Sequence, residues 1–179
     1  MKIYVQYKED NTLYTVSTSR IEENENGKVA EVDVDNYIDL FSHMNDYKFE
    51  NGKLIKIENL DYYKKLKNEE LNEACKKAII DGFEYEIENE VYHFSLDIEA
   101  QLNFQGAIKL FDDGLIENMM WTVQKNGEYK RISITKKIMD ELIVAIMDHK
   151  EKNISKYRDK LMPIVNNAKS IEEINAITW

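Results

Sequence analysis

Residues 82–103 read GFEYEIENEVYHFSLDIEAQLN, and this stretch decides the fold class. Gly82 follows a run rich in Lys, Glu and Leu, and it occupies the position that commonly ends a helix. Two aromatic-rich runs, Phe83–Ile87 and Val91–Ser95, predict a strand pair joined by a turn at residues 88–90. Asp97 is a typical N-cap for the helix that should follow. The succession of helix, hairpin and helix indicates an α+β fold.

The same alternation continues on both sides of this stretch. Upstream, apolar residues recur at helical spacing from Asp61 to Asp81, which predicts an amphipathic helix. Downstream, Met119–Gln124 and Tyr129–Ile134 flank the dipeptide Asn126-Gly127, a strong signal for a hairpin. The C-terminal domain is therefore expected to be a helix, a hairpin, a helix, a hairpin and a long last helix.

Thr135 is the predicted N-cap of that last helix, whose apolar positions reach Ile164 and Val165. Pro163 lacks a backbone N–H and should bend or weaken the helix near its end. Ser170 then opens a short terminal helix through a capping box.

The first third of the chain is richer in strand signals. Residues 2–7 and 13–16 predict a hairpin, and Val29–Val34 resembles a further strand. Tyr37–Phe41 predicts a helical turn, and Asn51-Gly52 predicts a second hairpin. We therefore expect two parts, a β-rich module over residues 1–58 that serves as a possible attachment region and an α+β domain over residues 59–179.

Charge and cysteine content exclude several functional classes. The net charge is −10, from 24 basic and 34 acidic residues, so we expect no nucleic-acid partner. No run approaches the roughly 20 apolar residues that cross a bilayer, and the N-terminus lacks the apolar core of a signal peptide. Cys75 is the single cysteine, which excludes a disulfide within the chain. These features predict a protein of the cytoplasm without membrane insertion.

The sequence contains no recognisable catalytic, cofactor or metal motif. His43, His93 and His149 are not spaced as metal ligands, and the predicted position of Cys75 late in a helix disfavours a thiolate. Asp33, Asp35 and Asp39 lack the glycine and glutamate of a calcium loop, so we interpret them as a solvated strand edge and turn. We expect no enzyme activity, no cofactor and no metal.

Candidate packing and interaction residues are aromatic or amide side chains. They are Trp121, Trp179, Tyr92, Phe94, Gln101 and Asn103. Trp121 is expected to pack beneath the last helix against Leu142 or Ile146, while Trp179 should dock onto its own domain or onto a neighbour. Gln101 and Asn103 form a polar group with Asp97, which a helix cap explains as well as a binding role does.

Several short runs also carry a family resemblance. They are Gly82–Tyr85, Val91–Asp97, Glu99–Asn103, Met120-Trp121, Asn126-Gly127, Ile134-Thr135 and Ile174–Trp179, with Tyr47–Leu54 as a further hairpin. From about residue 60 to its end the chain resembles an uncharacterised domain in the C-terminal portion of phage tail-fibre, baseplate and prophage tail-associated proteins. The resemblance supplies no catalytic residues.

The resemblance implies a structural or adaptor component of a phage tail or a tail-like bacteriocin, at the baseplate or at the tail-fibre attachment. Its partners would be other tail, baseplate or fibre proteins in a symmetric multi-subunit assembly. It would occupy the bacterial cytoplasm during assembly and then the particle. Three alternatives remain open: a receptor-binding accessory protein, a tail-fibre assembly chaperone that is not part of the particle, and a tail-associated cell-wall hydrolase.

Overall fold

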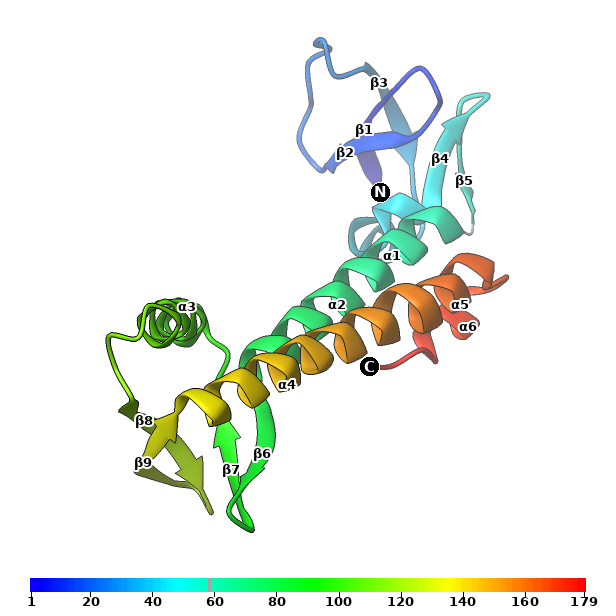
Figure 1. Ribbon diagram of the computed structural model, residues 1–179. Helices are drawn as coiled ribbons and strands as arrows, with labels where there is room; N and C mark the ends of the chain where they lie inside the picture. The colour runs from blue at the N-terminus through cyan, green and yellow to red at the C-terminus, as the bar shows by residue number, and fades with distance from the viewer. Residues whose placement is uncertain (58) are drawn as a thin grey trace. The chain divides into compact units, whose positions relative to one another are not determined.

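A computed structural model describes residues 1–57 and 59–179 as a mixed fold of helices and antiparallel sheets, so the predicted α+β class is confirmed (Figure 1). The residues form two compact units, Met1–Lys65 with Lys169–Glu172 and Leu66–Ala168 with Glu173–Trp179. The predicted domain boundary at residue 58 lies outside the described residues.

The elements follow one another in this chain order: β1 (Lys2–Tyr7), β2 (Leu13–Ser17), β3 (Lys28–Asp33), α1 (Tyr37–Ser42), η1 (Met44–Asp46), β4 (Tyr47–Glu50), β5 (Lys53–Lys56), α2 (Leu60–Asp81), β6 (Phe83–Ile87), β7 (Glu90–Phe94), α3 (Ile98–Asp112), β8 (Asn118–Lys125), β9 (Glu128–Thr135), α4 (Lys136–Ser155), η2 (Lys156–Leu161), α5 (Met162–Asn167) and α6 (Ile171–Asn175). The predicted strands of the first third are all present.

The first unit is built on a sheet of order β2-β1-β3 and a separate β4-β5 hairpin. Strand β1 is antiparallel to both neighbours and is paired along both edges. Its side chains Ile3 and Val5 are fully buried, together with Leu40 of α1. The β4-β5 turn at Asn51-Gly52 has φ of 51° and 79°, as its sequence predicted. These contacts give the first unit its own hydrophobic core.

Gly82 ends α2 in the conformation that the sequence predicted. Its φ is +93°, and an added Cβ would lie 1.9 Å from the carbonyl oxygen of Phe94. Only glycine fits this close approach of the helix end to β7. The turn after β6 differs from its prediction, because the loop contains two residues, Glu88 and Asn89, with φ of 53° and 66°. This two-residue hairpin pairs Glu84 with His93 and begins β7 at Glu90.

The sheet of the second unit has the order β6-β7-β8-β9 but is not continuous. β8 and β9 are paired over their whole lengths, whereas β7 meets β8 only where His93 is paired with Gln124. Helix α3 connects β7 to β8 (Figure 1). The core beneath these elements contains the fully buried residues Leu96, Ile134, Met139 and Leu142 together with Phe94.

Helices α2 and α4 lie side by side in the second unit (Figure 1). The imidazole Nε2 of His149 donates to the carbonyl oxygen of Ala78 at 3.0 Å, and the thiol of Cys75 lies 3.4 Å from the carbonyl oxygen of Asn153. Burial raises the pKa of the Cys75 thiol, which is 4% exposed. Cys75 is therefore the buried small hydrophobe that its helical position predicted.

The last helix is interrupted by the π-helical segment η2, which precedes Pro163. The N–H of Met162 bonds to the carbonyl oxygen of Tyr157, five residues back. A proline ring clashes with the carbonyl four residues before it, so the wider turn accommodates Pro163. Of the two apolar residues near the end of this helix, Val165 is buried, whereas the side chain of Ile164 is 54% exposed.

Candidate functional site

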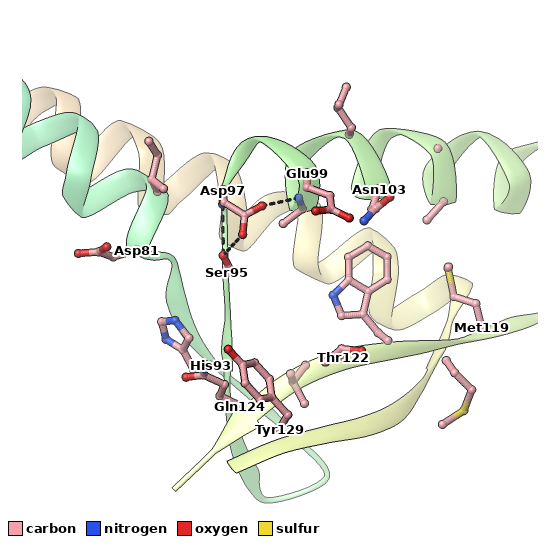
Figure 2. Close-up of a pocket in the computed structure, with 18 of the residues that line it drawn as sticks. Asp81, His93, Ser95, Asp97, Glu99, Asn103, Met119, Thr122, Gln124 and Tyr129 are labelled. Atoms are coloured by element: carbon pink, nitrogen blue, oxygen red, sulfur yellow. Dashed lines mark hydrogen bonds between the residues drawn. The ribbon is translucent and has the colours of Figure 1, made fainter. Parts of the chain in front are cut away.

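A groove of about 910 Å³ is the largest of the described pockets, and it lies in the second unit. Helix α3 forms one wall and strand β8 forms the other, as Figure 2 shows. The end of β7 and the segment between β7 and α3 close one end of the groove. The lining residues that bear on its chemistry are Asp81, Asp97, Glu99, Leu102, Asn103, Gly106, Leu110, Met120 and Trp121.

The wall formed by α3 is fixed at its N-terminus by Asp97, as the sequence predicted. The Asp97 carboxylate accepts the N–H of Ala100 at 2.7 Å and the hydroxyl of Ser95 at 2.9 Å (Figure 2). These two bonds, the backbone one first, lower the pKa of Asp97 below its usual range. Asp97 is therefore an ionised cap at neutral pH, and it adds a negative charge to this end of the groove.

Gln101 fixes the same wall from its inner side. Its Nε2 donates to the carbonyl oxygen of Leu96 at 2.7 Å, and its Oε1 accepts from Lys150 of α4 at 3.0 Å. The half-buried amide thus connects the end of β7, α3 and α4. Gln101 has a structural role and does not line the groove.

Trp121 lies where the floor of the groove meets the core. Its ring lies 4.4 Å, centroid to centroid, from the ring of Phe104 on α3. Trp121 is also packed against the core cluster that contains Leu142 and Ile146, the residues named in its prediction. Because Trp121 is half-buried and also lines the groove, it serves packing and leaves part of its surface available.

The floor of the groove includes an open strand edge. In an antiparallel sheet, alternate residues direct their backbone N–H and C=O groups to opposite sides. The side of β8 away from β9 is paired with β7 only at Gln124, so the stretch Asn118–Val123 has no strand partner there among the described residues. Arg131 donates one side-chain bond to the carbonyl oxygen of Met120 at 3.2 Å.

The charged residues that line the groove among the described residues are acidic, and His93 is the one basic side chain in this lining. Asp81, Asp97 and Glu99 are exposed carboxylates, and no lysine or arginine is part of this lining. Apolar side chains occupy the other part of the groove, where Leu102 is 61% and Met120 is 49% exposed. A groove with an acidic end, an apolar end and an open strand edge has the features of a polypeptide-binding surface.

The structure brings only part of the predicted residue set together. Trp121 and Asn103 line the groove, whereas Phe94 is buried in the core behind it at 1% exposure. Tyr92 lies outside the groove, with the ammonium of Lys125 5.7 Å from its ring centroid. Trp179 packs on a separate cluster formed around Leu71, Tyr157 and Val165.

Two histidine–carboxylate pairs in the structure were not predicted from the sequence. His93 Nδ1 lies 3.2 Å from Glu84 Oε1, and His43 Nδ1 lies 3.0 Å from Asp39 Oδ1. The first pair follows from the two-residue turn, because that register places Glu84 opposite His93. Ser95, two residues after His93, donates its hydroxyl to the Asp97 carboxylate, which makes it part of the helix cap.

Asp39 corrects the prediction of a solvated turn. It lies on α1, is half-buried, and accepts bonds from Lys56 at 2.7 Å, from the hydroxyl of Tyr47 and from His43. The bonds from Lys56 and Tyr47 lower the pKa of Asp39 to about 2. Asp39 thus joins α1 to the β4-β5 hairpin, while Asp33 and Asp35 are exposed as predicted.

Beside that cluster, Asp46 is 7% exposed and accepts the hydroxyl of Tyr63 at 2.8 Å. Burial, and then this hydrogen bond, raise the pKa of Tyr63 to about 12.

Within residues 1–57 and 59–179, no three His, Cys, Asp or Glu side chains are grouped so that they could bind a metal ion. No helix in the same ranges combines the length and apolar character needed to cross a membrane.

Residues 62–178 match the model of the family described as "Domain of unknown function (DUF4376)". The match covers more than half of the chain, and the protein belongs to this family. No curated protein and no solved structure matches the chain.

Proposed function

We propose that this protein is a non-enzymatic adaptor of a phage tail or tail-like bacteriocin particle, at the baseplate or at the tail-fibre attachment. The observation that carries the proposal is the groove between α3 and β8, whose open strand edge and mixed acidic and apolar lining suit a protein partner. The resemblance of residues 60–179 to tail-associated proteins supports the choice of assembly.

In this proposal the two parts bind different neighbours. The β-rich module of residues 1–58 attaches to one tail protein, and the helix–hairpin–helix–hairpin–long-helix domain of residues 59–179 binds a second one through its groove. The partners are other tail, baseplate or fibre proteins in a symmetric assembly, without nucleic acid, membrane insertion, metal or cofactor. The protein occupies the bacterial cytoplasm during assembly and the finished particle afterwards.

Mass spectrometry of purified particles, combined with electron microscopy, tests this proposal. We expect the full-length chain in finished particles at a fixed ratio to the other tail subunits. If the chain is absent from the particles but required for folding of the fibre, the assembly-chaperone function replaces the adaptor function.

A cell-wall hydrolase is a second candidate because His93 and Ser95 line the groove and Glu84 is paired with His93. The His93–Glu84 pair has the form of a base held by a carboxylate, but the hydroxyl of Ser95 is donated to Asp97. Turnover of purified cell-wall glycan or peptide by the pure protein, abolished by His93→Ala, would establish the hydrolase and overturn the adaptor.

A further inference from the structure

Two residues that line the groove are poor choices for the stability of their own helices. Gly106 lies in the interior of α3, and Asp81 is the last residue of α2. Natural sequences depart from local preferences mainly where function requires it. The coincidence of both residues in one groove indicates that the groove binds a ligand.

Gly106 is not required by the fold. An added Cβ would meet nothing within 4 Å, and the residue lies in the middle of a regular helix. Glycine is the least favourable helix residue after proline, so almost any replacement would stabilise α3. Its missing side chain leaves space in the groove wall between Leu102 and Leu110, four residues to either side.

Asp81 is placed against the dipole of its helix. The C-terminus of a helix carries partial negative charge and favours lysine or arginine, yet the last turn of α2 contains no basic residue. Asp81 is exposed and lies at the acidic end of the groove with Asp97 and Glu99. Three carboxylates with no lysine or arginine in the lining create a local negative potential that favours a basic ligand group.

The open edge of β8 defines the shape of the ligand. Residues 118–123 span about 20 Å at the usual rise of a strand, and their outward N–H and C=O groups can pair with an extended chain. Alternate side chains of such a chain would face the exposed apolar residues Leu102, Leu110 and Met120.

We propose that the groove binds an extended, basic segment of a partner protein, which adds to β8 as a further strand. A lysine or arginine of this segment pairs with Asp97 and Glu99, and its apolar residues pack beside Gly106. This inference rests on the proposed adaptor function, because it identifies the kind of segment that the neighbouring protein supplies.

Selection of displayed random peptides of about ten residues, a length that can form one strand, tests the inference. The target is the full-length protein, and binding of each enriched peptide is measured by fluorescence polarisation. We expect enriched peptides with one or two basic residues followed by alternating apolar residues. Their binding should change the amide resonances of Met119–Val123.

Gly106→Leu should weaken binding of an enriched peptide about ten-fold or more while raising the melting temperature of the protein. Gln105→Leu adds the same side chain to the next residue, outside the groove, and should leave binding unchanged. Asp81→Lys should likewise weaken peptide binding without loss of stability. Asp148→Lys, on the exposed surface of α4, is the control and should leave peptide binding unchanged.

The inference is overturned if no peptide is enriched, if the enriched peptides are acidic, or if Gly106→Leu and Gln105→Leu have equal effects. Its failure is distinct from failure of the adaptor function. If the protein is present in particles but binds no such peptide, the adaptor function stands and the groove inference fails. If the protein binds these peptides but is absent from particles, the adaptor function fails.

Discussion

Strands β1 and β8 both occupy inner positions in their sheets, but their two edges are paired to very different extents. β1 is paired with β3 along its whole length and with β2 from Tyr4 to Tyr7, so most of its backbone is bonded within the first unit. β8 is paired with β9 over eight residues and with β7 at a single residue. The comparison shows that an inner position in a sheet does not guarantee a closed edge.

The difference arises from how the neighbouring elements are connected. Short turns at residues 8–12 and a longer loop before residue 28 bring β2 and β3 onto β1. Helix α3 and the segment after it separate β7 from β8 in sequence, and β7 reaches β8 only at its His93. A strand edge that stays open on a stable scaffold is available to another chain.

The largest expected effect concerns two side chains of these strands that differ in burial, Ile3 of β1 and Met120 of β8. Ile3→Ala on β1 removes a fully buried side chain and should lower the free energy of unfolding by about 2–5 kcal/mol. Met120→Ala on β8 removes a side chain that is 49% exposed and should change it by no more than about 0.5 kcal/mol. Thermal unfolding followed by circular dichroism measures both, and equal losses would contradict the comparison.

Hydrogen exchange sharpens the comparison at the backbone. Amides of Ile3–Gln6 should all be protected, because both edges of β1 are paired. Alternate amides of Asn118–Val123 should exchange at least about a hundred-fold faster than their neighbours, since they face the open edge. Exchange measured residue by residue by NMR tests this, and uniform protection along β8 would mean that its edge is closed.

Two glycines should respond to the same substitution with opposite signs. Gly82→Ala places a Cβ against the backbone of Phe94 at a φ of +93° and should destabilise the protein by about 1–3 kcal/mol or more. Gly106→Ala meets nothing and should stabilise it by about 1 kcal/mol. Chemical denaturation of both variants checks the pair, and a destabilising Gly106→Ala would show that this glycine serves the fold after all.

The smallest effect concerns acid and the Asp39 cluster of the first unit. The pKa of Asp39 is lowered from 3.8 to about 2 in the folded protein, so its stabilising effect is complete above the unfolded value. That effect is lost as the pH falls from about 4 toward 2. The difference in melting temperature between the wild type and Asp39→Asn should therefore shrink over this range, while exposed Asp35→Asn serves as the control.

Much of the fold could be predicted because its turns have strong chemical signatures. Asn51-Gly52 and Asn126-Gly127 adopt positive φ at low cost, and both hairpins formed at the predicted residues. The turn at Glu88 and Asn89 has the same backbone but lacks the glycine, so the predicted loop was one residue too long. A shift of one residue changes every cross-strand partner, which is why the Glu84–His93 pair was missed.

The groove could be predicted only in part. Asp97, Asn103 and Trp121 were recognised from local patterns, since a helix cap, an exposed amide and a strand tryptophan are visible in sequence. Asp81 and Gly106 carried a signal as well, because each is unfavourable at its helix position. The open edge of β8 was not predictable, because it depends on how far α3 separates two strands in space.

The π-helical segment η2 changes which side of the last helix the residues after it face. From the buried Tyr157 the inward-facing positions continue at the partly buried Leu161 and the buried Val165, every fourth residue, whereas an undisturbed α-helix advances by about 3.6 residues per turn. A chain shortened by one residue within 156–161 would rotate everything after it by about 100°. Val165 would then occupy the exposed position of Ile164 and Asn166 the buried position of Val165, so the spacing of this one segment determines which surface the C-terminal residues present.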